Sequence, residues 1–355
     1  MPPPDPKSSR LLFVYCVIST LFCFRFIHLA KETVSSCEQP MTSLTRNLSS
    51  VPENFPRKIW QTSKTSAGGL GEDDRSSIQS WAKLNQKHRY EILTAHSAES
   101  YVRDRFAHRP DIEESFVDLQ DPILRADFIR YLVLLGDGGI YSDLDTKSLK
   151  PIEDWIPHTF REKTNLVVGV EYDSLGKGKW VDWTLELQFA TWAMMAKPGH
   201  LVLEITVDRV INRLRNLARK QEKTISGIKA SFHEVLDTTG PALFTEAVME
   251  AISFTTDTDF TWQNITGLTV PRLVGDILIL PINAFGSGQL HSNSGSPDGD
   301  TALVQHLFRG SWKSEHPFEE KKDENADEEK KEKEENKKKE EDRKQEEGKK
   351  DTTAQ

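Results

Sequence analysis

Apolar residues at helical spacing mark the centre of the chain and predict a helix with one buried face. They recur at steps of three and four residues, and they are Leu124, Phe128, Tyr131, Leu132 and Leu135. Asp121 suits the N-cap position and Pro122 the first helical position. Residues 136–139 are rich in glycine, which adopts positive φ at little steric cost, so we expect the helix to end there.

Other apolar runs predict strands and helices on both sides of this helix. Predicted strands cover residues 58–61, 90–93, 140–142, 166–172, 277–280 and 302–305. Helical spacing predicts helices over residues 76–85, 97–106, 200–220 and 240–250. Residues 107–120 suit a helix or an irregular segment, and residues 173–183 and 286–299 suit loops. This alternation predicts an α/β fold with one domain and a mostly parallel sheet.

Two acidic residues follow the short strand at 140–142. Asp143 and Asp145 are two positions apart, so on an extended chain their carboxylates point the same way. Close carboxylates repel unless a cation lies between them, and a divalent ion there would leave positions open for phosphate oxygens. Arg125, Asp127 and Arg130 lie outside the apolar stripe of the preceding helix, and the glycine turn can bring them near. The alternative is that both aspartates only form a turn or a cap.

The two ends of the chain differ from its middle. Residues 11–30 are mostly apolar and long enough to span a bilayer. Lys7 and Arg10 precede them, which predicts a cytoplasmic tail at residues 1–10 and type II topology. A cleaved signal peptide is the alternative. Residues 31–54 suit a stem, and residues 55–313 a catalytic domain. The tail, residues 314–355, is almost entirely charged from Glu319 onward, which predicts disorder or a solvated single helix.

Composition narrows the class of protein. The 355 residues carry a formal net charge of −9, which argues against a nucleic-acid partner. The chain has three cysteines, and two of them, Cys16 and Cys23, lie in the apolar segment. The predicted catalytic domain therefore cannot depend on a disulfide framework.

Five segments together resemble a known family. They are PRKIWQTSK at 56–64, LRADFIRYLVLLGDGGIYSDLDT at 124–146, LQFATWAMMAKPGH at 187–200, TGPALFT at 239–245 and HLFRGSW at 306–312. In this order they resemble fungal glycosyltransferase family 32, in particular the initiation-specific α-1,6-mannosyltransferases of the Golgi. The resemblance covers residues 55–313.

The resemblance implies a single nucleotide-diphospho-sugar transferase domain of the GT-A-like kind. The implied activity is that of a metal-dependent retaining mannosyltransferase, with GDP-mannose as donor and Mn²⁺ as metal. The implied acceptor is the oligomannose part of an N-glycan on a glycoprotein, with an α-1,6 linkage. The protein would be anchored in the Golgi membrane with its catalytic domain in the lumen, where it could form a complex with other mannosyltransferases.

The resemblance also assigns roles to the acidic pair and its neighbours. Asp145, and Asp143 directly or through a water, would hold the metal against the diphosphate, and Asp143 could also meet a ribose or sugar hydroxyl of the donor. His306 would be a third metal ligand through a neutral imidazole nitrogen. Arg125 and Asp127 would fix the mannose. No protein nucleophile or base is assigned, because the acceptor would attack from the leaving-group face.

Four further residues complete the expected donor site. Trp60 or Gln61, at the end of the first strand, would lie near the nucleotide base. Gln188 would approach the donor sugar, and Arg130 would contribute to donor binding beside the acidic pair. For Trp60, an ordinary place in the core is the alternative.

Three alternatives remain at this stage. Inositol phosphoceramide mannosyltransferases share the acidic pair and the preceding helix, although they tend to have more membrane-spanning segments. Phosphatases with a D-x-D-x-[TV] motif are a second class, but the fifth position here is Lys147. A non-catalytic relative that kept the fold is the third.

Overall fold

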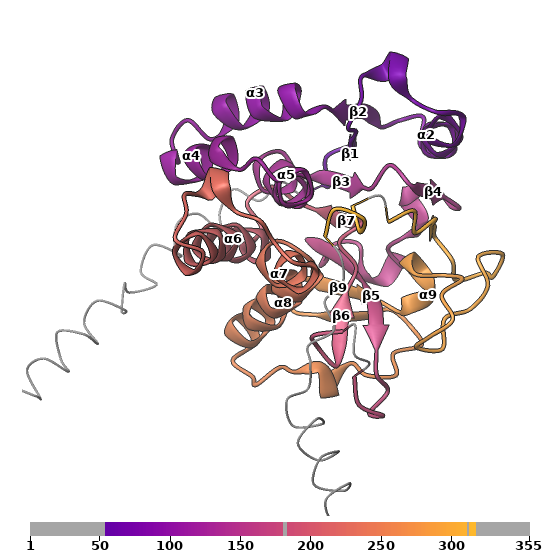
Figure 1. The fold of residues 1–355 in the computed structure, drawn as a ribbon. Coiled ribbons are helices and arrows are strands. Elements are labelled where there is room, and N and C mark those ends of the chain that lie inside the picture. The colour runs from indigo at the N-terminus through magenta and orange to yellow at the C-terminus, as the bar shows by residue number, and fades with distance from the viewer. Residues whose placement is uncertain (1–53, 180–182, 311, 317–355) are drawn as a thin grey trace, which may run out of the picture. The chain divides into compact units, whose positions relative to one another are not determined.

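The computed structural model describes residues 54–179, 183–310 and 312–316 (Figure 1). The predicted cytoplasmic tail, membrane anchor and most of the stem lie outside these residues, and so does the charged tail from residue 317. Among the described residues, none of the helices has both the length and the apolar character needed to cross a membrane.

All of the predicted strands and helices occur, with boundaries shifted by a few residues. The helices are α2 (Glu72–Leu84), α3 (Ala95–Arg105), α4 (Pro110–Asp118), α5 (Pro122–Gly136), α6 (Leu201–Lys220), α7 (Phe232–Thr238), α8 (Pro241–Thr256) and α9 (Ile282–Phe285). The strands are β1 (Lys58–Thr62), β2 (Arg89–Leu93), β3 (Gly139–Ser142), β4 (Thr146–Ser148), β5 (Leu166–Asp173), β6 (Leu187–Phe189), β7 (Ala193–Ala196), β8 (Arg272–Val274), β9 (Ile277–Leu280) and β10 (Val304–His306). Asp121 caps α5 as predicted, because its Oδ1 accepts a hydrogen bond from the amide of Ile123.

The main sheet is mixed, which corrects the prediction of a mostly parallel sheet. Its order is β2-β1-β3-β7-β5-β9-β8, and β6 also pairs with β5. β1 is parallel to β2 and β3, and β5 is parallel to β9. However, β7 is antiparallel to both β3 and β5, and β6 and β8 are antiparallel to β5 and β9. β6 follows β5, and β9 follows β8, without a crossover helix, and such direct returns produce antiparallel pairs. β7 runs in the same direction as β6, so it is antiparallel to β5 as well.

Both faces of the sheet are buried. Alternate strand residues face opposite sides, so Leu166 and Val168 of β5 join one core and Val167 joins the other. The first core lies under the helices α3 to α8. The second contains Trp81 of α2, Phe285 of α9 and Val304 of β10. The fold therefore has three layers, with the sheet in the middle (Figure 1).

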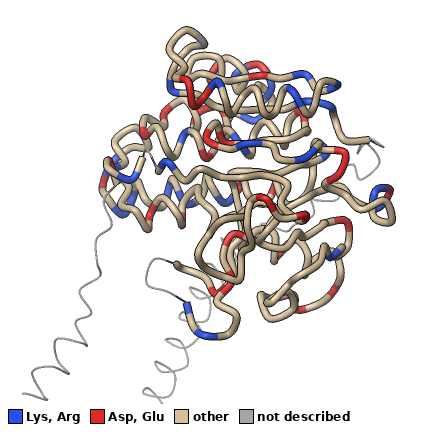
Figure 2. Tube along the Cα trace, turned by 90° about the vertical axis from the view of Figure 1, so that its right-hand side faces the viewer, with Lys and Arg blue, Asp and Glu red and all other residues tan. Residues whose placement is uncertain are grey.

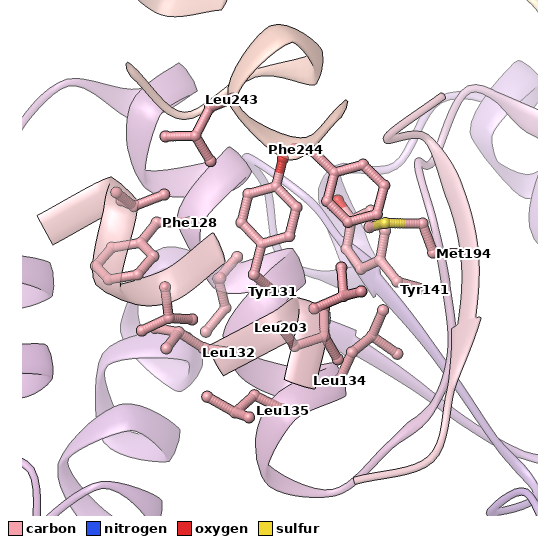
Figure 3. Close-up of a cluster of buried hydrophobic side chains, with 14 of the residues drawn as sticks. Phe128, Tyr131, Leu132, Leu134, Leu135, Tyr141, Met194, Leu203, Leu243 and Phe244 are labelled. Carbon is pink, nitrogen blue, oxygen red and sulfur yellow. The ribbon is translucent and has the colours of Figure 1, made fainter. Parts of the chain in front are cut away.

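Helix α5 is buried on nearly every side, whereas the sequence predicted one buried stripe. Ile129, Val133 and Leu134 are each at most 2% exposed, in addition to the predicted stripe. Tyr131 stacks on Phe244 of α8 with 5.6 Å between ring centroids (Figure 3). Because α5 lies between the sheet and the other helices, residues predicted to be outside the stripe are also enclosed.

Lys and Arg positions and Asp and Glu positions are interspersed along the chain (Figure 2). Arg109, which precedes α4, pairs with Asp208 of α6 at 2.8 Å, and Arg209 of α6 pairs with Glu246 of α8 at 2.9 Å. Pairs at the surface contribute little to stability individually, so the buried apolar contacts hold this layer together.

The glycine turn between α5 and β3 has a strict steric requirement. Gly139 has a φ of 101°, and a Cβ atom there would lie 2.5 Å from the carbonyl oxygen of Lys58 in β1. Gly138, at φ 66°, accepts a hydrogen bond from Trp60 Nε1 at 2.9 Å through its carbonyl. Glycine is therefore what allows β3 to start directly after α5 and pair with β1.

We expect Gly139→Ala to lower the free energy of unfolding by about 3 kcal/mol, because it adds both backbone strain and a clash with β1. Denaturant unfolding measures this change. Gly68→Ala is the matched control, since a Cβ there meets no atom of the described residues within 4 Å and its φ is not positive. Equal stability of both variants would contradict the steric argument.

Candidate active site

The turn after β3 is held by several hydrogen bonds to one aspartate. The carbonyl oxygen of Asp143 accepts hydrogen bonds from Thr146 Oγ1 at 2.7 Å and from Gln61 Nε2 at 3.2 Å. The amide of Asp143 donates to the carbonyl of Trp192 at 2.9 Å. These bonds fix the backbone and leave the side chains of Asp143 and Asp145 for other contacts.

A two-stranded pairing brings a distant histidine to this turn. β10 pairs antiparallel with β4, with His306 opposite Thr146. His306 Nε2 lies 3.2 Å from Asp145 Oδ1, and the indole of Trp192 stacks on the imidazole at 4.5 Å. The amide of Arg309 donates to Asp145 Oδ2 at 3.1 Å. His306 itself ends the strand, whereas the sequence placed the strand at residues 302–305.

Asp143, Asp145 and His306 form a cluster with the composition of a metal site. One possible ligand atom from each residue lies within 4.8 Å of the other two. Carboxylate oxygens and an imidazole nitrogen are ligands that Mn²⁺ and similar divalent ions accept. His306 Nδ1 is buried and has no hydrogen-bond partner among the described residues. Burial acts to raise the pKa of Asp145, but interactions with His306 and Arg309 outweigh it and lower this pKa, which favours the anionic ligand.

Arg130 connects this cluster to α5. Its Nη2 lies 2.8 Å from Asp127 Oδ1 and 3.4 Å from Asp143 Oδ1, and its Nη1 donates to Thr191 Oγ1 at 2.6 Å. Thr239 Oγ1 donates to Asp127 Oδ2 at 2.9 Å. Burial raises the pKa of Asp127 to about 6, although the charge of Arg130 and the bond from Thr239 act in the opposite direction. The helix, the turn and the loop of Thr191 therefore meet at one guanidinium, and Asp127 connects them to Thr239.

A cavity of about 950 Å³ opens beside this network, which is large enough for a nucleotide sugar. Of the residues predicted from the sequence, those that line it are Arg125, Asp127, Arg130, Asp143, Asp145, Gln188 and His306.

Arg125 lines the cavity but makes its contacts away from the carboxylate network. Its Nη2 pairs with Glu99 of α3 at 2.9 Å, and its guanidinium lies 4.7 Å from the ring centroid of Phe116. Its expected role in fixing a sugar stays a prediction.

Trp60 and Gln61 lie behind the wall of the cavity. Trp60 is 1% exposed and packs edge-on against Tyr101, and Gln61 is completely buried. Tyr90 donates a hydrogen bond to Gln61 Oε1 at 2.5 Å, so both ends of this amide are used within the protein. Thr62 and Ser63, the next residues along the chain, do line the cavity. The expected contact of Trp60 or Gln61 with a base stays a prediction.

The structure adds contacts at the site that the sequence did not predict. Thr191 and Thr239 hold Arg130 and Asp127, Tyr141 donates to Asp143 Oδ1 at 2.8 Å, and Arg309 caps Asp145. Glu171 lines the cavity near the end of β5. A charged residue inside the otherwise apolar run LVVGVEY is the signal that could have identified it.

Burial raises the pKa of Glu171 to about 8, although Gln188, Arg130 and Lys313 act to lower it. At neutral pH this side chain is therefore mainly a neutral carboxylic acid.

The sequence matches one family model and several named proteins. A family model described as "Glycosyltransferase sugar-binding region containing DXD motif" matches residues 71–161, which include the acidic pair. The initiation-specific alpha-1,6-mannosyltransferase of Schizosaccharomyces pombe is 36% identical over 266 residues, or 74% of this chain and 65% of that protein, slightly under two thirds. The putative glycosyltransferase HOC1 of Saccharomyces cerevisiae is 31% identical over 277 residues, or 75% of this chain and 67% of that protein. The mannosyl phosphorylinositol ceramide synthase SUR1 of the same yeast is 29% identical over 126 residues, or 35% and 31%.

We expect Arg130→Met to lower the free energy of unfolding by about 3–5 kcal/mol, because it leaves two carboxylates without their buried partner. Denaturant unfolding provides the measurement. Arg103→Met, which removes an exposed arginine of α3, should leave stability nearly unchanged. A small loss for Arg130→Met would show that Asp127 and Asp143 do not depend on this guanidinium.

Glu171 should also make stability depend on pH. Its folded-state pKa of about 8 exceeds the ordinary value of 4.5, so between these values the folded state holds a proton that the unfolded state has lost. The free energy of unfolding therefore falls as pH rises through this window, with a contribution of up to about 1.4 kcal/mol per pH unit. We expect Glu171→Gln to flatten this slope between pH 5 and 8.

Thermal unfolding across that pH range measures the slope. Glu234→Gln is the control, because hydrogen bonds from Ser231 and Lys220 lower the pKa of Glu234 despite its burial. The stabilisation that Glu234 provides is complete above its unfolded-state pKa and is lost only in more acidic solution. Glu234→Gln should therefore leave the slope of stability against pH unchanged between pH 5 and 8. An unaltered slope in Glu171→Gln would mean that Glu171 is ionised in the folded protein.

Proposed function

The chain belongs to the glycosyltransferases with a DXD motif, glycosyltransferase family 32, and on this premise we propose that it is a mannosyltransferase. Its proposed reaction moves mannose from GDP-mannose to the oligomannose part of an N-glycan, in an α-1,6 linkage and with retention of configuration. The observation that carries the proposal is the cluster of Asp143, Asp145 and His306 at the wall of a cavity of about 950 Å³. The name of the Schizosaccharomyces pombe relative supports mannose as the sugar.

In the proposal, Asp145 and His306 hold a divalent ion, and Asp143 holds it directly or through a water. Mn²⁺ bound there would neutralise charge on the diphosphate leaving group. The contacts of Asp145 with His306 and with the amide of Arg309 keep this carboxylate oriented and anionic. The donor set of two carboxylates and one imidazole supports this assignment.

The residues of α5 serve the donor sugar in this proposal. Arg130 brings a fixed positive charge next to Asp143, where it can balance charge that develops on the leaving phosphate. Asp127 lines the same cavity and can accept a hydrogen bond from a mannose hydroxyl. No protein nucleophile is needed, because the acceptor attacks from the face that the leaving group departs. The position of Arg130, Asp127 and Asp143 together on the cavity wall supports a GT-A-like donor site.

The acceptor distinguishes the two mannosyltransferase classes. The partial match to SUR1 covers about a third of the chain, whereas the matches to the other two relatives cover about three quarters. We therefore propose the N-glycan acceptor over inositol phosphoceramide. Incubation with GDP-mannose and each acceptor in turn, with linkage analysis of the product, separates these classes, and transfer to neither acceptor would favour a non-catalytic relative.

We also propose that residues 11–30 anchor the protein in the Golgi membrane, with the catalytic domain in the lumen and other mannosyltransferases as partners. Asn264 begins an Asn-Ile-Thr sequon in the described part of the chain, and its residue is exposed. A glycan on Asn264, detected by glycosidase treatment and mass spectrometry, is the expected result for a luminal domain.

We expect Asp145→Ala to abolish transfer from GDP-mannose, with a loss of at least about a hundredfold, because the ion loses an anionic ligand in the cavity. Initial-rate assays with added Mn²⁺ measure transfer. A chelator should abolish wild-type activity in the same way, and Mn²⁺ should restore it.

Asp154→Ala is the matched control, since Asp154 is an exposed aspartate outside the cavity. The thermal unfolding of Asp145→Ala should show that the variant is folded. Wild-type turnover by the folded Asp145→Ala protein would remove the basis of the metal assignment.

A further inference from the structure

Strand β5 contains a β-bulge at Glu171. Val170 pairs with Phe189 and Tyr172 pairs with Gln188, so Glu171 is an extra residue on β5 between two successive partners on β6. A bulge bends the strand and re-aims the extra side chain, and bulges are frequent beside active sites. Here the extra side chain lines the large cavity.

Asp173 and Glu171, at this end of β5, differ in how many hydrogen bonds their carboxyl groups accept from the protein. Asp173 accepts hydrogen bonds from Thr266 Oγ1 at 2.9 Å, from the amide of Gly267 at 2.7 Å and from the amide of Leu175 at 2.9 Å. It therefore has a structural role in holding loops. Glu171, in the described part of the chain, has one side-chain hydrogen bond, from Gln188 Nε2 at 3.3 Å.

The side-chain amide of Gln188 also lacks part of its hydrogen bonding within the described residues. Its residue is completely buried and lines the cavity, and its Oε1 has no hydrogen-bond partner among the described residues. Buried amide oxygens in proteins nearly always accept a hydrogen bond, so a cavity wall with an unpartnered one suits a ligand that donates.

The carboxyl of Glu171 and the amide oxygen of Gln188 together suit a hydroxyl group as their ligand. A neutral carboxylic acid can donate one hydrogen bond, and the amide oxygen can accept one. A hydroxyl has both a proton to give and lone pairs to accept, whereas a phosphate ester oxygen has only lone pairs. Arg130 of α5 and Lys313 of the C-terminal segment are the charged groups that influence Glu171, and Glu171 is not part of the metal-type cluster. The pair is thus suited to an uncharged polyhydroxyl ring.

We propose that Glu171 and Gln188 bind one hydroxyl group of a sugar ring in the cavity, with Gln188 Oε1 accepting its hydrogen and Glu171 donating to its oxygen. The inference rests on the proposed function only in taking a sugar as the occupant. The ring belongs either to the donor or to the acceptor, and kinetic constants for the two substrates separate these sources.

The test compares Glu171→Ala with Glu171→Gln in the full-length protein. We expect Glu171→Ala to raise KM for one substrate about tenfold or more, because the hydroxyl loses a hydrogen-bond donor. Glu171→Gln keeps a donor of similar shape and should restore KM to within about threefold of wild type. A raised KM for GDP-mannose in donor hydrolysis without acceptor assigns the ring to the donor, and a raised KM for the oligomannose alone assigns it to the acceptor.

Glu204→Gln and Glu204→Ala are the matched controls. Burial also raises the pKa of Glu204, but this residue lies on α6 and does not line the cavity. Neither control should change KM for either substrate. Unchanged KM values in Glu171→Ala would overturn the inference, and so would a Glu171→Gln variant as impaired as Glu171→Ala, since that result requires an ionised carboxylate.

A binding measurement separates this inference from the proposed function. If the wild-type protein transfers no mannose, the proposed function fails, while thermal shifts with mannose, oligomannose, GDP and GDP-mannose still test Glu171. The expected result is that Glu171→Ala loses the shift given by the sugar and keeps the shift given by GDP. A sugar-dependent shift that is equal in wild type and Glu171→Ala overturns the inference.

Discussion

The buried guanidinium of Arg130 is the interaction on which the site depends. It contacts Asp127 on its own helix, Asp143 on the turn after β3 and Thr191 between β6 and β7. Three segments that are distant in sequence are therefore held by one charged group that cannot lose its proton. A buried charge of this kind is costly without carboxylate partners, so its pairs with Asp127 and Asp143 favour one arrangement of α5 against the turn.

The second constraint is the short pairing of β10 with β4, which places residues more than 160 positions apart in contact. Without it, Asp145 would have neither His306 nor the amide of Arg309. The indole of Trp192 packs against the imidazole and also donates to the carbonyl of Phe285 at 2.9 Å. The metal-type cluster thus depends on the second core as well as on the strand that carries the acidic pair.

The sequence predicted the parts of this molecule that depend on local chemistry. Asp121, Pro122 and the glycine turn define α5 because caps, proline and positive φ act within a few residues. The mixed sheet was missed because the direction in which β6, β7 and β8 pair with their neighbours is set by tertiary contacts and not by apolar spacing. His306 was found through the family resemblance, since no local pattern connects it to Asp145. Glu171 was missed because a one-residue bulge, invisible in the alternation of the strand, decides where its side chain lies.

The cavity wall changes character along its length, and this change follows from how each carboxyl is surrounded. Hydrogen bonding and charge lower the pKa of Asp145 against its burial, so that carboxyl is an anion suited to a cation. At Glu171 the neighbouring groups that lower the pKa do not offset the effect of burial, so its carboxyl stays mainly neutral and suits hydroxyl groups. A substrate with a charged diphosphate at one end and an uncharged sugar at the other would meet both environments in a single cavity. The same residue type thus serves two chemistries, and the partners supplied by the fold decide which one applies.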